Sequence, residues 1–167
     1  MKDIKLKKLT LSAILIAIAV VGSMFSFPIF GSKCAPIQHI VNIVSAVTLG
    51  PIYALGVAFS SSLIRNLLGL GTLLAFPGSI FGAFLSALIY KKTKNLNFSI
   101  LGEVFGTSIL GGLSAYPIAI KFLGIPNSKI SFYSFIIPFF ISTFVGSIVS
   151  GIVISYLKKT RILNNFN

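Results

Sequence analysis

Acidic residues are nearly absent from this chain of 167 residues. Asp and Glu together number two, against 14 Lys and Arg, and the formal net charge is +12. The two acids, Asp3 and Glu103, lie in different parts of the chain, so a catalytic carboxylate pair and a carboxylate metal cage are both excluded. Cys34 is the single cysteine, so neither an intrachain disulfide nor a cysteine metal motif can form.

Sequence motifs for nucleotide binding and for catalysis are missing as well. No GxxxxGK[ST] phosphate loop occurs, so the chain cannot use ATP by itself. If it moves a solute uphill, another subunit or an ion gradient must drive the step. An intramembrane enzyme with a Ser/His dyad would need His39, the single histidine, to activate a serine on another helix, and no motif supports that pairing. We therefore expect no enzyme, no catalytic residue, no metal and no cofactor.

Hydrophobic residues, by contrast, dominate the composition. They make up 55% of the chain and charged residues only 10%, with a mean hydropathy of +0.99, whereas roughly a quarter of residues are charged in soluble proteins. The apolar residues form stretches of about 20 residues, the length that a helix needs to cross a bilayer. These features predict an all-α integral membrane protein with a single domain over residues 1–167, and the basic charge does not indicate nucleic-acid binding.

Gly, Pro and Lys divide the apolar stretches into six predicted transmembrane helices. Their approximate ranges are 9–30, 37–49, 51–68, 73–90, 99–123 and 132–157. Pro28 and Gly31 are expected to end the first helix, Gly50 and Pro51 separate the second from the third, and Pro117 predicts a kink in the fifth. The prediction is one six-helix bundle.

The basic residues indicate the orientation of this bundle. Three clusters lie just beyond apolar runs: Lys2, Lys5, Lys7 and Lys8; Lys91, Lys92 and Lys94; and Lys158, Lys159 and Arg161. Positive clusters stay in the cytoplasm, which places both termini inside and requires an even number of spans. The remaining basic residues, Lys33, Arg65, Lys121 and Lys129, then fall at the outer side.

Rare polar residues collect in the segment KCAPIQHIVNIV, residues 33–44. On a helix, Gln38, Asn42 and Ser45 follow i, i+4, i+7, and His39 and Asn42 follow i, i+3, so the four share one stripe. Polar side chains are costly inside a membrane and mark sites there, so we expect the stripe to face the bundle interior. It serves either as a hydrogen-bonding clamp between helices or as a ligand site.

Further candidate binding residues lie near the outer ends of the predicted helices. Arg65 and Asn66 end the third helix just before Gly-Leu-Gly-Thr72, and the arginine either contributes to a site or extends to the lipid headgroups. Tyr116 and Tyr133 either anchor the interface or stack on a planar ligand.

Glu103 is predicted to lie in the first turn of the fifth span, near its cytoplasmic start. An acid there complements the helix dipole. We expect a structural role for Glu103, paired with a nearby lysine.

Small residues recur at a spacing of four, which lets helix backbones approach closely in lipid. The pairs are Ala13/Ala17, Gly78/Gly82, Gly102/Gly106, Ala115/Ala119 and Gly146/Ser150. Most of them are expected simply to pack the bundle.

Three segments resemble the ThiW family, whose members are regarded as thiazole-specific S components, the substrate-binding subunits of energy-coupling factor transporters. The segments are KCAPIQHIVNIVSAVTLGP (33–51), SSLIRNLLGLGTLLAFPGSIFGA (61–83) and GEVFGTSILGG (102–112). The resemblance implies a subunit in a prokaryotic plasma membrane that captures a vitamin precursor from outside. It also implies partners, namely a transmembrane coupling protein and two ABC-type ATPases. Ala13 and Ala17 match the AxxxA motif through which related S components meet the coupling protein.

The charges help to choose among ligands. Thiamine carries a permanent cation, which calls for a carboxylate or several aromatic faces, yet the predicted outer half has neither Asp nor Glu. Hydroxyethylthiazole is neutral and flat, so Gln38, His39 and Asn42 are expected to hydrogen-bond it, with Arg65, Asn66 and Thr72 nearby and Tyr116 or Tyr133 stacking on its ring. The alternatives are a phosphorylated thiazole that suits Arg65, another precursor such as hydroxymethylpyrimidine or thiamine itself, and a self-sufficient small-solute carrier.

Overall fold

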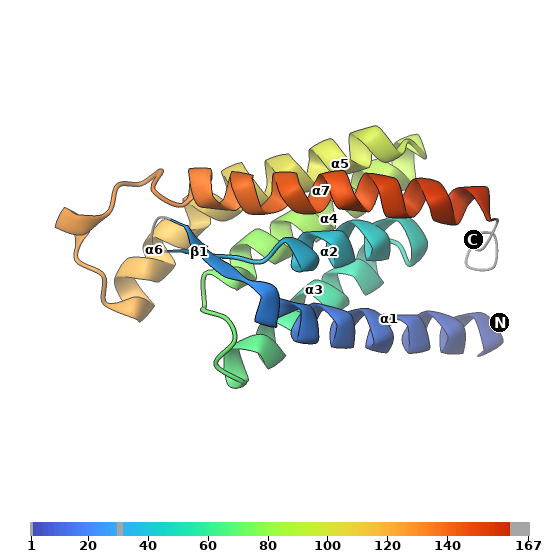
Figure 1. Cartoon of the computed structure of the whole chain (residues 1–167), viewed down its shortest axis with the longest axis horizontal. Coiled ribbons are helices and arrows are strands. Elements are labelled where there is room, and N and C mark those ends of the chain that lie inside the picture. Colours follow the sequence, from blue (N-terminus) through green and yellow to red (C-terminus); the bar gives the residue numbers. More distant parts are fainter. Residues whose placement is uncertain (1, 30–31, 161–167) are drawn as a thin grey trace.

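The computed structural model describes residues 2–29 and 32–160, which are mostly helical (Figure 1). The α-helices are α1 (Lys2–Gly22), α2 (Pro36–Thr48), α3 (Pro51–Leu67), α4 (Ala75–Thr93), α5 (Leu96–Phe105), α6 (Gly112–Leu123) and α7 (Ile136–Lys159). Shorter elements are the 3-10 turns η1 (Ser23–Phe25) and η3 (Asn127–Lys129), the π-helix η2 (Gly106–Gly111) and the strands β1 (Phe27–Ile29) and β2 (Ser32–Cys34). Because α5, η2 and α6 follow without a break, the described residues form six long helical segments besides the two 3-10 turns.

The helices form an elongated bundle in which α2 packs against α1, α3, α4 and α7 (Figure 1). The start of α1 and the end of α7 lie at one end of the bundle, called here the terminal end. The strands β1 and β2, the last turn of α3 and the start of α4 lie toward the other end, called here the hairpin end. Because α2 is surrounded, most of its side chains are buried, polar ones included.

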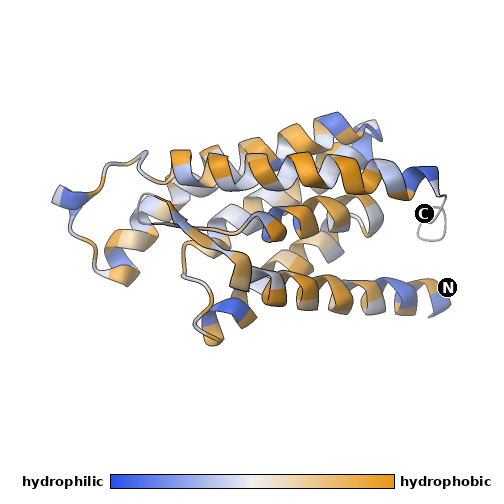
Figure 2. Cartoon of the chain, viewed as in Figure 1, coloured by the Kyte–Doolittle hydropathy of each residue, from blue (hydrophilic) through white to orange (hydrophobic). Residues whose placement is uncertain are grey.

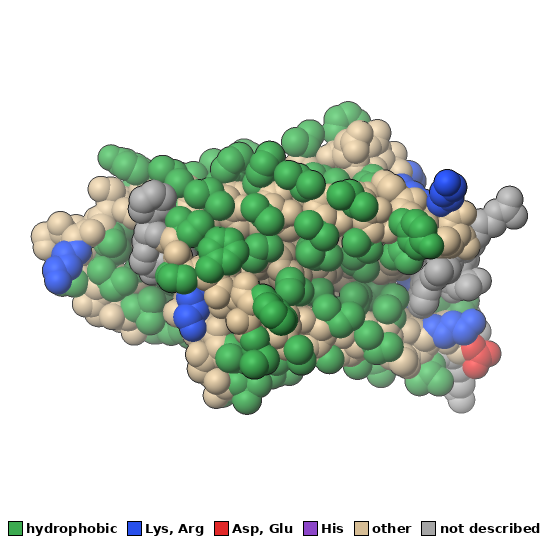
Figure 3. Space-filling model, in the orientation of Figure 1, with side chains coloured by type: hydrophobic (Ala, Val, Ile, Leu, Met, Phe, Trp, Pro, Cys, Tyr) green, Lys and Arg blue, Asp and Glu red, His purple; other side chains and the backbone are tan. Residues whose placement is uncertain are grey.

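The surface is that of a membrane protein. On the face shown in Figure 3, hydrophobic side chains cover the side of the bundle and Lys and Arg lie toward its ends, and Figure 2 shows the same trend along the helices. Three helices are long and apolar enough to cross a membrane: Asp3–Phe25, Leu96–Leu123 and Ile136–Lys159. At 13 residues α2 extends only about 20 Å, less than the hydrocarbon thickness. The structure therefore supports an all-α membrane protein, whereas the six membrane crossings and the orientation of the termini stay predictions.

The first helix ends earlier than predicted. The expected end at Phe30 lies outside the described residues, as does Arg161, but α1 already stops at Gly22. Gly and Ser are weak helix formers, and the chain after Gly22 passes through one 3-10 turn into β1, which pairs antiparallel with β2. A short hairpin thus replaces the predicted last turns of the helix.

The fifth helix also departs from the prediction. Pro117 lies within α6, but the irregular segment is the π-helix η2, which comes before it. Its glycines lie against the α4 backbone, since a Cβ on Gly106 would be 2.6 Å from the Phe81 carbonyl oxygen, and one on Gly111 would be 2.6 Å from Gly78 Cα. The π-helix therefore lies at a close approach to α4, and such bulges are frequent at functional sites.

Several of the predicted small-residue pairs pack the bundle, as expected. A Cβ on Gly82 would overlap Thr107 Oγ1 and lie 2.8 Å from the Glu103 carboxyl group, and Ala115 and Ala119 are fully buried. Ala13 and Ala17 differ, because both are exposed on α1. A turn at Gly50, with φ +86°, joins α2 to α3 in a conformation that favours glycine.

We predict that Gly82→Ala destabilises the protein by about 1–3 kcal/mol, because the added methyl group overpacks the contact with Thr107 and Glu103. Gly56→Ala is the matched control, since Gly56 is also helical and its Cβ would meet nothing within 4 Å. Unfolding of the detergent-solubilised variants measures both effects. Equal stability of the two variants would contradict the close approach of α4 to η2.

Candidate functional site

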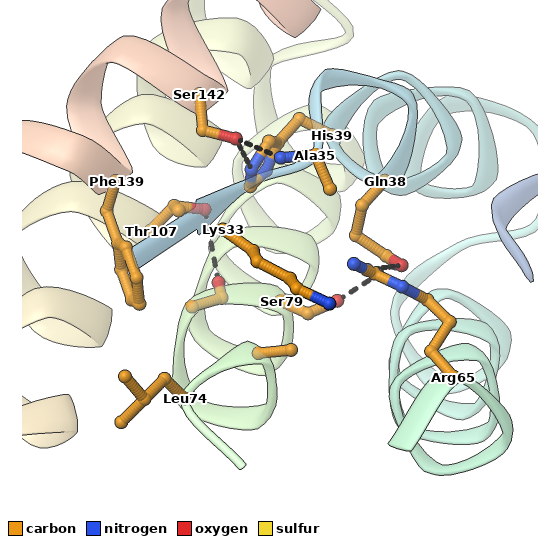
Figure 4. Close-up of a pocket in the computed structure, with 12 residues that line it drawn as sticks. Lys33, Ala35, Gln38, His39, Arg65, Leu74, Ser79, Thr107, Phe139 and Ser142 are labelled. Carbon is orange, nitrogen blue, oxygen red and sulfur yellow. Dashed lines mark hydrogen bonds between the residues drawn. The ribbon is translucent and has the colours of Figure 1, made fainter. Parts of the chain in front are cut away.

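A cavity opens at the hairpin end of the bundle, between α2, α3, α4, η2 and α7 and beneath β2 (Figure 4). Its volume is about 40 Å³, and it opens to the outside. The lining residues are Lys33, Ala35, Gln38, His39, Arg65, Leu74, Ala75, Gly78, Ser79, Thr107, Phe139 and Ser142. The wall is therefore polar toward α2 and α3 and apolar at Leu74 and Phe139, a mixture typical of small-molecule sites.

The polar wall begins with an amide on α2. Gln38 Oε1 accepts a hydrogen bond of 2.9 Å from Arg65 Nη1 on α3. Gln38 Nε2 lies 3.0 Å from both Ser61 Oγ and Ser79 Oγ, and 3.1 Å from Asn42 Oδ1. The amide group has two hydrogens for these three acceptors, so it can donate to different pairs of them. It thereby links α2 to α3 and α4.

Glu103 occupies the centre of the bundle below the cavity. The residue is 0% exposed, and its Oε1 accepts a hydrogen bond of 2.9 Å from Asn42 Nδ2 and lies 3.0 Å from His39 Nδ1. Thr107 Oγ1 lies 3.3 Å from the same oxygen. The expected pairing of Glu103 with a lysine is therefore wrong, because α5 begins at Leu96, earlier than predicted, and carries the residue into its second turn.

His39 connects this carboxylate with α7 and faces the cavity (Figure 4). Because a carboxylate only accepts, we assign the imidazole proton to Nδ1. Nε2 lies 3.1 Å from Ser142 Oγ, which already accepts the Ala35 N–H at 2.9 Å. The serine hydroxyl can therefore donate to Nε2, and this chain of bonds fixes the ring orientation.

Five buried side-chain nitrogen and oxygen atoms have no hydrogen-bond partner within the described residues, namely Ser62 Oγ, Arg65 Nε, Glu103 Oε2, Thr143 Oγ1 and Ser147 Oγ. Of these residues, Arg65 lines the cavity. Arg65 is itself only 2% exposed. Unpaired buried polar atoms are uncommon and call for an explanation.

The structure brings some predicted site residues together and separates others. Gln38, His39 and Arg65 line the cavity, whereas Asn42 lies beneath it and holds Gln38 and Glu103 in place. Asn66 and Thr72 fasten the loop between α3 and α4, since Asn66 Nδ2 donates to the carbonyls of Ser62 and Thr72.

The predicted tyrosines do not line the cavity among the described residues. Tyr133 is 67% exposed, and Tyr116 packs edge-on against Phe132 with ring centroids 5.4 Å apart. Phe139, one turn into α7, provides the aromatic face instead.

Sequence reasoning missed nine of the lining residues, among them Ser79, Thr107, Phe139 and Ser142. Serine, threonine and phenylalanine are common in this chain, so composition gives no signal for them. The position of Ser79 does offer a signal, because Ser79 follows Gly78 of the GxxxG pair that brings α4 against η2. Phe139 and Ser142 follow i, i+3 on α7 and so share one face of that helix.

Cys34 lies buried beside the cavity without lining it. Its thiol donates to the Pro138 carbonyl at 3.2 Å, and burial raises the pKa of the thiol. A raised pKa keeps the thiol protonated and unreactive, in agreement with a packing role. Among the described residues, no group of three or more His, Cys, Asp or Glu is placed to hold a metal ion.

Comparison with protein families gives one assignment. A family model described as thiamine-precursor transporter protein (ThiW) matches residues 9–160, nearly the whole chain. Comparisons with curated proteins and with solved structures give no match.

We predict that Glu103→Ala lowers the free energy of unfolding by about 3 kcal/mol or more, because it leaves the donors of His39 and Asn42 without their acceptor. Glu103→Gln keeps one acceptor oxygen and should cost less. Asp3→Asn is the control, since the other acid of the chain is exposed. Denaturant titration in detergent measures all three, and wild-type stability of Glu103→Ala would disprove the buried network.

Proposed function

The chain belongs to the ThiW family of thiamine-precursor transporters, and we propose that it is the substrate-capture subunit of an energy-coupling factor importer. In this role it binds the thiazole precursor hydroxyethylthiazole from outside, and partner subunits use ATP to drive uptake. The observation that carries the proposal is the cavity at the hairpin end, where polar side chains held by a buried network face an apolar wall. A transporter family assignment also argues against catalysis as the function.

For the membrane arrangement we propose six spans with both termini in the cytoplasm of a prokaryotic cell. The start of α1 and the end of α7 lie at the same end of the bundle, as an even number of crossings requires. That end carries Lys91 and Lys92 in the last turn of α4 and Lys158 and Lys159 in the last turn of α7. With these lysines inside, the cavity faces outward.

A flat heteroaromatic ring suits this cavity. We propose that the ring lies against Phe139, which takes the place expected for Tyr116 or Tyr133, and that Gln38 and His39 satisfy its polar atoms. Since Asn42 lies below the cavity, its role is to position Gln38 and Glu103. Asn66 and Thr72 would shape the adjoining loop.

A cationic ligand suits the cavity poorly, although a carboxylate lies closer to it than the sequence predicts. Glu103 does reach His39, so a carboxylate lies nearer the cavity than predicted. It does not line the cavity, however, and His39 and Asn42 already bond its Oε1. Lys33 and Arg65, by contrast, line the cavity directly. Thiamine, with its permanent positive charge, remains disfavoured.

ATP hydrolysis must be carried out by partners, because the chain has no phosphate loop. We propose that these are a transmembrane coupling protein and two ABC-type ATPases, and that the coupling protein contacts α1 at Ala13 and Ala17. Both alanines are exposed at four-residue spacing, so another helix can approach the α1 backbone there.

We predict that the purified protein binds hydroxyethylthiazole and that His39→Ala weakens binding by about 1 kcal/mol or more, the scale of a lost buried hydrogen bond. Isothermal titration in detergent measures both. Thr93→Ala, far from the cavity and exposed, is the control. Tight binding of another vitamin, with no thiazole affinity better than high micromolar, would refute the substrate assignment.

We predict that Ala13→Leu and Ala17→Leu block uptake in cells that contain the coupling protein and ATPases, yet spare thiazole binding in detergent. The larger side chains prevent close approach of a partner helix. Ile18→Leu, exposed on the same helix, is the control. Loss of binding would assign the alanines to the fold, and full uptake in cells lacking the partners would favour a self-sufficient carrier.

A further inference from the structure

The buried guanidinium of Arg65 has no ionic partner among the described residues. Arg65 is 2% exposed, donates from Nη1 to the neutral amide of Gln38 at 2.9 Å, and leaves Nε without a partner. Among the described residues, the Glu103 carboxylate near the cavity contacts His39 and Asn42 instead. A full positive charge thus lies at the cavity wall with only neutral contacts.

A second cation points into the same cavity. Lys33 extends from β2 over the opening, and its side chain and that of Arg65 reach toward one another (Figure 4). Asp3, the other acid of the chain, lies on the first turn of α1, at the terminal end of the bundle. Two like charges, the buried Arg65 and the exposed Lys33, therefore line a cavity whose lining includes no carboxylate among the described residues.

Such an arrangement is unfavourable until an anion enters. Burying a charge costs several kcal/mol unless it is paired and hydrogen-bonded. A phosphate or carboxylate group between Arg65 and Lys33 would pair both charges and accept the hydrogen bond that Nε now lacks. We propose that the cavity binds a solute bearing an oxyanion group, which occupies the space between Arg65 and Lys33.

This inference rests on the proposed function for the identity of the solute. If the ligand is a thiazole precursor, its phosphate ester is the preferred form and the free alcohol the weaker one. The chemistry of the rest of the lining suits such a molecule, because Phe139 and Leu74 form an apolar wall for the ring beside the cationic side. A lipid headgroup offers the same anion chemistry but would not use that wall.

Two measurements test the inference separately from the thiazole assignment. The first compares the affinities of purified protein for hydroxyethylthiazole and for its phosphate ester. We expect the ester to bind at least about tenfold more tightly, the factor that one charge-assisted hydrogen bond provides. Arg65→Gln, which keeps a donor for Gln38, should reduce that ratio to about one, whereas the control Lys129→Gln on the exposed η3 turn should leave it unchanged.

The second measurement needs no thiazole. Thermal unfolding is followed in sodium phosphate and in sodium chloride of equal ionic strength, and we expect phosphate to stabilise the wild-type protein but not Arg65→Gln. Lys33→Gln, on the exposed hairpin, provides the same test if Arg65→Gln fails to fold.

The outcomes separate the two proposals. Tight binding of the alcohol with an equal or weaker ester overturns the anion site and leaves thiazole capture intact. No binding of either thiazole, with phosphate stabilisation that depends on Arg65, overturns thiazole capture and supports the anion site. Stabilisation by phosphatidylglycerol micelles without stabilisation by inorganic phosphate would assign the site to lipid and overturn the inference for a solute.

Discussion

The fold depends on one constraint, the burial of the Glu103 carboxylate inside an apolar bundle. A carboxylate without water must find donors within the protein, and His39 and Asn42 of α2 provide them. Those two donors bring a short, polar-striped helix to the centre of the molecule. Ser142 then holds the far side of the imidazole, which ties α7 into the same network.

Close approach of the helices follows from that constraint. Glu103 can reach α2 only if the helix that carries it packs tightly on α4, and Gly82 leaves the room that its carboxyl group occupies. The π-helix η2 continues the contact, since Gly106 and Gly111 lie on the α4 backbone. There Thr107 Oγ1 lies 3.1 Å from the Gly78 carbonyl and 3.3 Å from Glu103 Oε1, and with one proton it donates to one of them at a time. Glycine packing and the polar network are therefore parts of one arrangement.

Local patterns in the sequence could predict part of this polar network and of the helix boundaries. The spacing of Gln38, His39 and Asn42 predicts an inward stripe on α2, and the stripe is buried as expected. Helix boundaries near Gly50 are right within a few residues, because Gly and Pro act on the chain locally. Glu103 was misjudged because its partners lie more than 60 residues away in the sequence, and no local pattern encodes such contacts. The hairpin after Gly22 was missed for a related reason, since β1 and β2 are too short to show a strand pattern.

The two kinds of charge beside the cavity have opposite consequences. Oε1 of Glu103 is matched by donors from α2, while Oε2 has no partner within the described residues. The bonds to Oε1 help to make Gln38 and His39 a preorganised polar surface. Arg65 is not matched, and a bound solute is what would complete its contacts. Such a site favours ligands that carry a partner group for its unpaired buried polar atoms. An analogue that lacks this group leaves those atoms without a hydrogen bond and binds more weakly. Charge on the solute, more than ring shape, should then decide which thiamine precursor this subunit retains.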